Sequence, residues 1–288
     1  MVWVNQVIQG ILLGGLYALL AAGLSLVFGV MRLVNLAHGD LSVIAAYLAF
    51  VLADDLGVNP LVTLAMVVPA MAAIGFVLQY SLLNFTLDSG LAPLLATFGL
   101  AVVIQNVLQE QFSADTRRLQ IGSIGTKSIH VASEITIGWF PLITLTSAVI
   151  LLGGLQLMLR FTALGRALRA TSDDQRAAQL VGIDNRRIYA IATAISLATV
   201  AVAGIFLFAR TQFAPTYGPL RLIFAFEAVI IGGLGSLWGT LVGGIVLGVA
   251  QTVGAQVSPG WGVLSGHLVF LAVLVLRPTG LFARSQVA

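Results

Sequence analysis

The sequence predicts an all-α, polytopic transmembrane helical bundle, and three observations support this prediction. Of the 288 residues, 59% are hydrophobic and 9% are charged, with a mean hydropathy of +1.03, which excludes an ordinary soluble globular domain. Charge is absent from several stretches long enough to cross about 30 Å of hydrocarbon as a helix. These stretches are residues 1–31, 56–87, 135–159, 188–209 and 228–276. The third observation is that a single segment, residues 160–187, holds most of the helix-prone polar sequence.

The apolar pattern divides the chain into eight or nine hydrophobic spans. In chain order they cover residues 6–30, 41–52, 61–85, 91–109, 139–159, 188–208, 222–251 and 263–276. The span at 222–251 contains a glycine-rich tract, and it counts twice if that tract separates two crossings. Residues 110–138 are the longest polar connection, and we expect them outside with some strand-like pieces. We favour nine segments, with the N-terminus outside, because an even count would place Arg277 outside, against the positive-inside rule.

Residues 160–187 are predicted to lie in water on the cytoplasmic side. They contain six arginines and three aspartates, and one charge at the membrane centre costs roughly 2.5–3.5 kcal/mol. Apolar residues at helical spacing predict two short amphipathic helices, the second capped at Ser172 and Asp173 and stopped by Gly182. Because arginine-rich loops are retained inside, topology explains the net charge of +3, and we expect no nucleic-acid partner.

A short polar tract interrupts the apolar pattern after the first span. Asn35, His38, Gly39 and Asp40 occur together there, and such broken backbone is tolerated at membrane depth where it is buried in protein or lines a cavity. We therefore treat these four residues as candidates for a substrate pathway or gate. The alternative is a tight cytoplasmic turn in which Asn35 caps a helix and His38 or Asp40 lies in water.

The glycine-rich tract at 231–244 is the second candidate gate, because glycine permits large backbone changes. Its candidate residues are Gly232, Gly233, Gly235 and Ser236. The tract shares a loose pattern of small residues with residues 34–47, which suggests an internal repeat with a substrate site between the copies.

Glu227 is a further pathway candidate, because a carboxylate among apolar residues in a span is a functional candidate by default. The alternative places Glu227 near the interface, paired with Arg221 or Arg210. His267 lies on an apolar helix, where we interpret it as a satisfied packing histidine.

The chain itself offers no site for a cofactor. It contains no cysteine, and therefore neither a disulfide nor a thiolate metal site. Residues 122–128 contain glycines before a Lys-Ser pair, but they lack the spacing and the strand-to-helix setting of a phosphate-binding loop. We therefore expect no nucleotide, metal or catalytic residues in this chain.

Four motifs together resemble the inner-membrane permease subunit of bacterial branched-chain amino acid ABC importers. They are Asn-Leu-Ala-His-Gly-Asp at 35–40 with Ala-Ala-Tyr at 45–47, Gly-Arg-Ala-Leu-Arg-Ala at 165–170 through Val-Gly-Ile at 181–183, Gly-Gly-Leu-Gly-Ser at 232–236 with glycines at 239, 243 and 244, and Leu-Arg-Pro-Thr-Gly-Leu-Phe at 276–282. The resemblance spans essentially the whole chain. It implies a single transmembrane permease domain, residues 1–288, with a cytoplasmic coupling-helix loop at 163–185.

The resemblance also implies partners. A separate ABC ATPase subunit would bind ATP and Mg and move the coupling helix. A second permease subunit, in a heterodimer or a homodimer, and a periplasmic substrate-binding protein would complete the importer in the bacterial inner membrane. The residues expected to couple to the ATPase are Gly165, Arg166, Leu168, Arg169, Asp173, Asp174, Ala177, Leu180 and Gly182, with Leu168, Ala177 and Leu180 as the apolar docking face.

Substrates implied by the resemblance are branched-chain or other small amino acids, and related solutes such as amides, urea or carboxylic acids. The alternative function is an ion-coupled secondary transporter or channel that works without ATP, which would need paired ionisable groups in the membrane. An intramembrane enzyme built on His38, Asp40 and Ser42 matches no motif with a known mechanism. We therefore expect a translocation subunit and no enzyme activity in this chain.

Overall fold

The computed structural model describes residues 2–87, 90–132 and 135–282. In these ranges the α-helices are α1 (Val2–Met31), α2 (His38–Leu56), α3 (Leu64–Ser81), α4 (Ala92–Phe112), α5 (Trp139–Phe161), α6 (Ala163–Asp173), α7 (Gln175–Leu180), α8 (Asn185–Arg210), α9 (Gly218–Gly232), α10 (Leu237–Val257) and α11 (Trp261–Leu276). Short 3-10 helices cover η1 (Leu83–Phe85), η2 (Gly122–Gly125) and η3 (Pro215–Tyr217). Two strands, β1 (Ser128–Ala132) and β2 (Ile135–Gly138), pair antiparallel.

The predicted all-α membrane bundle is confirmed. Six helices of the described residues are long and apolar enough to cross a bilayer, namely α1, α3, α4, α5, α8 and α10. Strand-like pieces were expected between residues 110 and 138, and the strands β1 and β2 lie there. The count of eight or nine spans stays a prediction.

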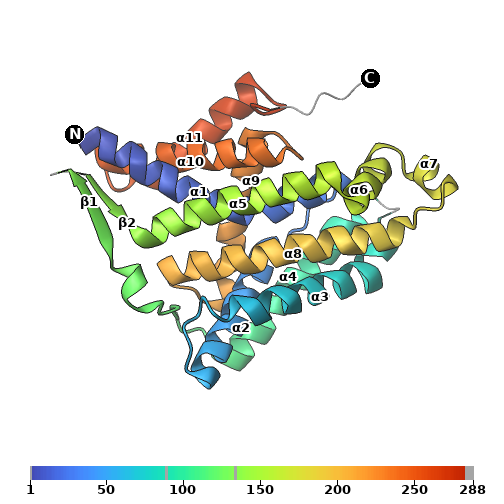
Figure 1. The fold of residues 1–288 in the computed structure, drawn as a ribbon, viewed down its shortest axis with the longest axis horizontal. Helices are drawn as coiled ribbons and strands as arrows, with labels where there is room; N and C mark the ends of the chain where they lie inside the picture. The colour runs from blue at the N-terminus through green and yellow to red at the C-terminus, as the bar shows by residue number, and fades with distance from the viewer. Residues whose placement is uncertain (1, 88–89, 133–134, 283–288) are drawn as a thin grey trace.

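Helices α1 and α8 form the centre of the bundle (Figure 1). Helix α1 packs most extensively on α10, and α8 packs most extensively on α3. The glycines of α1 explain the first pairing, because a methyl group at Gly14 or Gly10 would overlap the α10 backbone at Ile245 or Val249. Close backbone approach at small residues is the usual basis of helix association in lipid.

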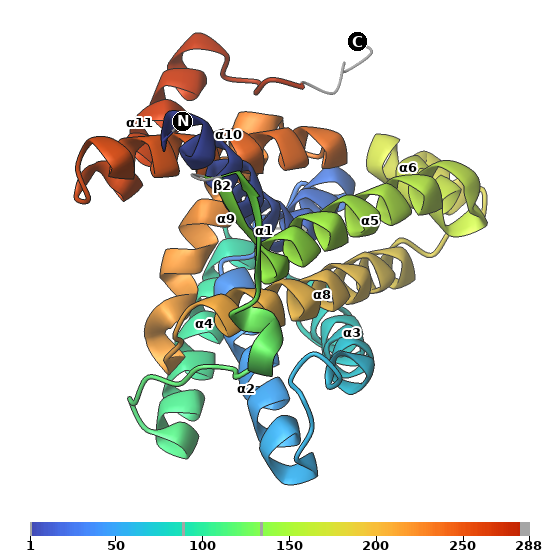
Figure 2. The same ribbon diagram turned by 60° about the vertical axis from the view of Figure 1, so that its left-hand side comes forward.

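The two ends of the bundle carry different structures. The β1–β2 hairpin and the N-terminus lie at one end, and the α6–α7 pair lies at the other (Figure 1). Helices α2 and α4 contact each other on the side of the bundle away from α10 and α11 (Figure 2). The expected coupling segment and the hairpin therefore lie at opposite ends of the bundle.

Helices α1 and α8 have similar neighbours in the chain, while the internal repeat predicted for residues 34–47 and 231–244 stays a prediction. Helix α1 is followed by a break at 32–37 and then α2, while α8 is followed by a break at 211–217 and then α9. The two long helices run in opposite directions in Figure 1. Helix α1 packs on α10, the helix that follows α9, and α8 packs on α3, the helix that follows α2. The break before α2 therefore has a structural counterpart in the break before α9.

Part of the segment 210–221, which connects the spans predicted at 188–208 and 222–251, is buried. Phe213, Ala214, Pro215 and Gly218 are all buried, and Gly218 packs against Asp40 at the start of α2. The chain turns back into the bundle here, and the start of α9 packs against the start of α2.

Candidate functional site

The corner between α5 and α6 holds the expected coupling helix against the bundle. Thr162 caps α6, with its hydroxyl accepting a hydrogen bond of 3.0 Å from the Gly165 amide. Gly165 lies so close to the backbone of Leu159 that a methyl group would overlap it, and an Arg169 guanidinium N–H donates to the Leu159 carbonyl. Glycine at position 165 is therefore required by packing.

Helix α6 is amphipathic in the predicted way, but its apolar side faces the protein. Leu168 and Thr171 are completely buried, while Arg166 and Asp173 are exposed. Leu168 was expected to offer an apolar surface to a partner, and its burial in the bundle shows that it anchors α6 instead.

Helix α7 begins one residue later than the sequence suggested. Asp174 is its cap, and one carboxylate oxygen accepts hydrogen bonds of 2.8 and 3.0 Å from the amides of Arg176 and Ala177. These bonds, that from Ala177 first, hold the pKa of Asp174 below its ordinary value. The expected cap residue Ser172 instead donates to the Gly29 carbonyl of α1 at 2.8 Å, and so ties α6 to the membrane helices.

The far end of α7 exposes an apolar tip. Leu180 is 89% exposed and Val181 is 77% exposed, and Ala177 is exposed beside them. Gly182 adopts a φ of +88°, the left-handed conformation that favours glycine, and ends the helix as predicted. Two bulky apolar side chains are therefore exposed next to each other at the tip of a charged segment.

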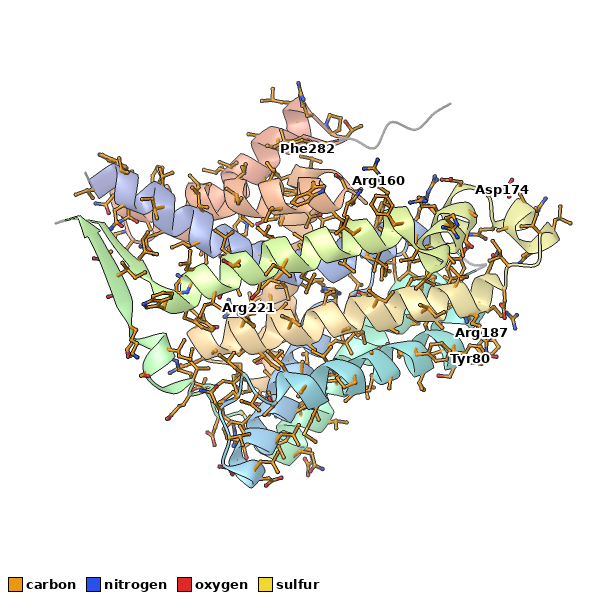
Figure 3. The ribbon with its side chains drawn as sticks, in the orientation of Figure 1. Tyr80, Arg160, Asp174, Arg187, Arg221 and Phe282 are labelled. Carbon is orange, nitrogen blue, oxygen red and sulfur yellow. The ribbon has the colours of Figure 1, made fainter. Side chains whose placement is uncertain are left out.

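Two residues that hold this segment were not singled out from the sequence. The Asn185 side chain donates to the Gln175 carbonyl at 2.9 Å and lies 3.4 Å from the Thr171 hydroxyl, which connects α6 and α7 to the start of α8. Asp184 caps α8 by accepting from the Arg187 amide. An aspartate directly before a helix, followed by asparagine as its first residue, is the signal that could have predicted this. Figure 3 shows Arg160, Asp174 and Arg187 gathered at this end of the molecule.

The tract before α2 is buried, so the interpretation that places His38 or Asp40 in water is wrong. Asn35 accepts a hydrogen bond of 3.0 Å from the Ala37 amide, which shapes the turn into α2. His38 is 1% exposed, and its Nε2 lies 2.8 Å from the carbonyl oxygen of Leu20, near the middle of α1. Helix α2 therefore begins beside the middle of α1.

Asp40 is a fully buried carboxylate at the crossing of the two interrupted helices. One oxygen accepts a hydrogen bond of 2.9 Å from the side chain of Gln105 on α4, and the other has no partner among the described residues. Gly39 and Gly218 touch backbone to backbone, because a methyl group at Gly39 would overlap the Gly218 carbonyl. The starts of α2 and α9 therefore meet in the interior of the bundle.

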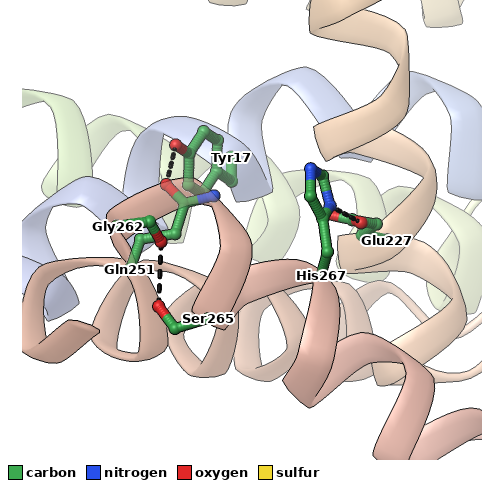
Figure 4. A network of polar contacts seen from close by, with 6 residues as sticks. All are labelled: Tyr17, Glu227, Gln251, Gly262, Ser265 and His267. Atoms are coloured by element: carbon green, nitrogen blue, oxygen red, sulfur yellow. Dashed lines mark hydrogen bonds and ion pairs between the residues drawn. The ribbon is translucent and has the colours of Figure 1, made fainter. Parts of the chain in front are cut away.

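Glu227 pairs with His267 of α11, and not with Arg221 or Arg210 (Figure 4). The Glu227 side chain is 5% exposed and that of His267 is 37% exposed. The second carboxylate oxygen of Glu227 has no partner in the described residues. His267 also stacks on Phe224, so it is a packing histidine, as expected. Its pairing with Glu227 was not predicted from the sequence.

A second polar contact lies beside this pair in Figure 4. The Tyr17 hydroxyl of α1 donates to the Gln251 side chain of α10 at 2.5 Å, and the Tyr17 ring stacks on Phe224. Phe224 is therefore in contact with both polar pairs, and it links α1, α9 and α11.

The glycine tract separates α9 from α10. Gly233 and Gly235 have φ values of +106° and +80°, and Ser236 caps α10 by accepting from the Gly239 amide at 3.1 Å. Gly232 crosses Gly239 so closely that a methyl group on either would overlap the other's backbone. Every candidate in this tract therefore has a defined backbone role.

The C-terminal segment closes over this break. The amides of Leu281 and Phe282 donate to the carbonyls of Ile231 and Gly232 at 2.8 and 3.0 Å, and Gly280 packs on Gly233. These bonds satisfy carbonyls at the end of α9 that have no helical partner. The motif at 276–282 is thus a cap for α9, a role that the sequence analysis did not predict.

Helix α9 connects the candidate pathway groups. Gly218 at its start touches Asp40, Glu227 follows nine residues later, about 13 Å along the helix, and Gly232 ends it. Asp40 and Glu227 therefore form two separate polar sites. His38 and Ser42 are not paired either, because Ser42 donates to the Gly39 carbonyl. The described residues contain no group of three or more acidic, histidine or cysteine side chains suited to a metal.

Comparison with known proteins matches this architecture to one family. The family profile described as "Branched-chain amino acid transport system / permease component" matches residues 6–276. This chain belongs to that family. The permease is 28% identical to the high-affinity branched-chain amino acid transport system permease protein BraD of Pseudomonas aeruginosa, over 99% of this chain and 97% of BraD.

Two relatives in Escherichia coli K12 extend the comparison. The permease protein LivH is 27% identical over 99% of this chain and 97% of its own length. The permease protein LivM is 26% identical over 94% of this chain and 68% of its own length. No solved structure matches significantly. The permease is therefore an inner-membrane protein of a branched-chain amino acid ABC transport system, and its relatives are transport subunits.

Proposed function

We propose that the permease moves branched-chain amino acids inward as the membrane subunit of an ABC importer, driven by a separate ATPase subunit that binds ATP and Mg. A second, related permease subunit and a periplasmic substrate-binding protein complete the complex. The relatives of both the LivH and the LivM type support pairing with a related but different subunit.

The observation that carries this proposal is the α6–α7 segment. It stands between two spanning helices, is anchored by buried Leu168, and presents exposed Leu180 and Val181 at its tip. An amphipathic helical element with apolar anchors is suited to a groove on a partner. Movement of the ATPase would reach the bundle through α5 and α8, and through Ser172, which is bonded to α1.

Nine hydrophobic segments are proposed for the membrane, with α6 and α7 inside and the β1–β2 hairpin outside. The six long helices supply six crossings. Helices α2 and α9 each start in the interior, at the contact of Gly39 with Gly218, and each is proposed to supply one further crossing. Helix α11 supplies the last crossing.

The pathway is proposed to run along α9, past Asp40, His38 and Asn35 at one end and Glu227 in the middle. The unpartnered oxygens of Asp40 and Glu227 support this placement, because a buried carboxylate oxygen without a partner carries a high energetic cost. The break at Gly232, Gly233, Gly235 and Ser236 is proposed to act as the gate on the α6–α7 side.

Reconstitution with the ATPase, the second permease and the binding protein tests the proposal. We expect ATP-dependent uptake of leucine, isoleucine or valine into liposomes, and co-purification of the ATPase with the permease. Glu227→Gln should lower uptake with the complex intact, while Gln256→Ala, an exposed position on α10, should not. Uptake driven by an ion gradient without ATP would contradict the proposal and favour a secondary transporter.

A further inference from the structure

A cavity of about 350 Å³ lies where α6 meets the membrane helices. Helices α1, α5, α6 and α10 all contribute to it, together with Phe282 of the C-terminal segment. The lining residues that matter here are Ser25, Leu159, Arg169, Ser236, Trp238 and Phe282. The cavity therefore borders both the coupling helix and the break between α9 and α10.

One polar side chain of the cavity wall is buried without a partner. Ser25 is 0% exposed, and its hydroxyl makes no hydrogen bond among the described residues. Ser25 and Gly29 both line the cavity and are four residues apart on α1, so they share one face of the helix. A buried hydroxyl without a partner is costly and indicates a ligand that supplies one.

The electrostatics of the cavity favour an anion. Arg169 lines the cavity, and one of its guanidinium N–H groups donates to the Leu159 carbonyl. The described residues place no carboxylate within ion-pair distance of this guanidinium. Leu237 and Trp238, in the first turn of α10, also line the cavity, and first-turn amides lack helical acceptors and lie at the positive end of the helix dipole. Among the residues that the structure describes, no aspartate or glutamate lines the cavity.

The rim of the cavity is apolar and aromatic. Trp238 and Phe282 are 45% and 49% exposed, and Leu26, Val30 and Leu159 line the wall behind them. Half-exposed aromatic side chains next to arginine are typical of the membrane interface. The cavity thus combines an anion site with a surface for hydrocarbon.

We propose that this cavity binds the head group of an anionic phospholipid, phosphatidylglycerol in the test below, from the leaflet on the α6–α7 side. Arg169 and the first turn of α10 hold the phosphate, as basic pockets between spans do for anionic lipids. Ser25 lies four residues, about 6 Å, beyond Gly29 toward the membrane interior, the direction in which the ester carbonyls follow the phosphate. The Ser25 hydroxyl donates to one of these carbonyls.

Occupancy would fix the position of the coupling helix relative to the gate. The lipid would touch Arg169 of α6 and Ser236 at the start of α10 at the same time. The permease would then respond to the anionic lipid content of its membrane, independently of which solute it moves.

The test is lipid binding to the purified, full-length permease. Native mass spectrometry and thermal unfolding compare phosphatidylglycerol, phosphatidylcholine and inorganic phosphate. We expect the wild type to retain phosphatidylglycerol preferentially and to be stabilised by it. Arg169→Gln should weaken this binding roughly tenfold, as expected for the loss of one charge-assisted hydrogen bond. Arg166→Gln, the same change at an exposed position of α6 that does not line the cavity, should leave it unchanged.

Two outcomes would overturn the proposal. Equal stabilisation by inorganic phosphate would show that the site takes a free anion, and equal binding by the Arg169 and Arg166 variants would show that the cavity is not the site. Because Arg169 also supports the Leu159 carbonyl, Ser25→Ala gives a second test that leaves this contact intact. Unchanged phosphatidylglycerol affinity in the Ser25 variant would likewise count against the site.

Discussion

Asp174 shows how one side chain sets the start of a functional element. Its carboxylate accepts two backbone hydrogen bonds at the start of α7, and these lower its pKa. A carboxyl whose pKa is lower in the folded state contributes stability above its unfolded pKa and loses this contribution as the pH falls through the folded pKa.

We therefore predict that α7 opens at acidic pH. Hydrogen exchange at the amides of Arg176 and Ala177, corrected for the intrinsic rate, should accelerate as the pH falls below the ordinary range of aspartate. Asp174→Asn keeps an uncharged acceptor and should remove this pH dependence. An equally steep pH dependence in the Asn variant would show that another group controls α7.

Gly39 is a second residue with a single dominant constraint. Any side chain there meets the Gly218 carbonyl, so Gly39→Ala has to separate α2 from α9. We expect a loss of unfolding free energy of about 1–3 kcal/mol, as for other overpacked sites, measured by thermal unfolding in detergent. Gly99→Ala is the matched control, since nothing lies within 4 Å of the added methyl group on α4. Equal effects of the two changes would refute the close crossing.

Helix α7 leads to a prediction at the level of elements. Leu180 is so exposed that Leu180→Asp should leave the fold of the permease unchanged, while it weakens binding to the ATPase and ATP-coupled uptake. Co-purification of the ATPase and the thermal unfolding of the permease alone measure the two effects separately. Gln179→Asp, also exposed on α7, controls for charge. Normal ATPase association in the Leu180 variant would exclude the α7 tip from the interface.

The break between α9 and α10 depends on the C-terminal segment. Gly280 has a φ of +81° and packs on Gly233, so Gly280→Val is both strained and too large for the site. We expect it to free the amides of Leu281 and Phe282 from the end of α9, and so to raise hydrogen exchange there. Gly260→Val, at a position where an added Cβ meets nothing within 4 Å, should leave exchange at Leu281 and Phe282 unchanged. Unchanged exchange in the Gly280 variant would contradict the clamp.

The orientation of the whole molecule gives the last prediction. The chain contains no cysteine, so single cysteines report sidedness without background. Ser123→Cys, at the hairpin end, should react with an impermeant maleimide in intact cells, and Gln179→Cys, at the α6–α7 end, should react only after the cells are opened. The reverse pattern would invert the proposed topology and place the coupling segment outside.

Local patterns of the sequence determined the six long spanning helices, the charged segment and its stop at Gly182, because helical length, charge in lipid and glycine backbone freedom act over a few neighbouring residues. Tertiary structure alone decided which groups meet. Asp40 accepts a hydrogen bond from Gln105, and Glu227 pairs with His267; these partners are 65 and 40 residues away in the chain. Leu168 is buried in the bundle. Such pairings follow from how whole helices cross, and the interrupted helices α2 and α9 meet only because Gly39 and Gly218 allow their backbones to touch. No periodicity within a single helix carries that information.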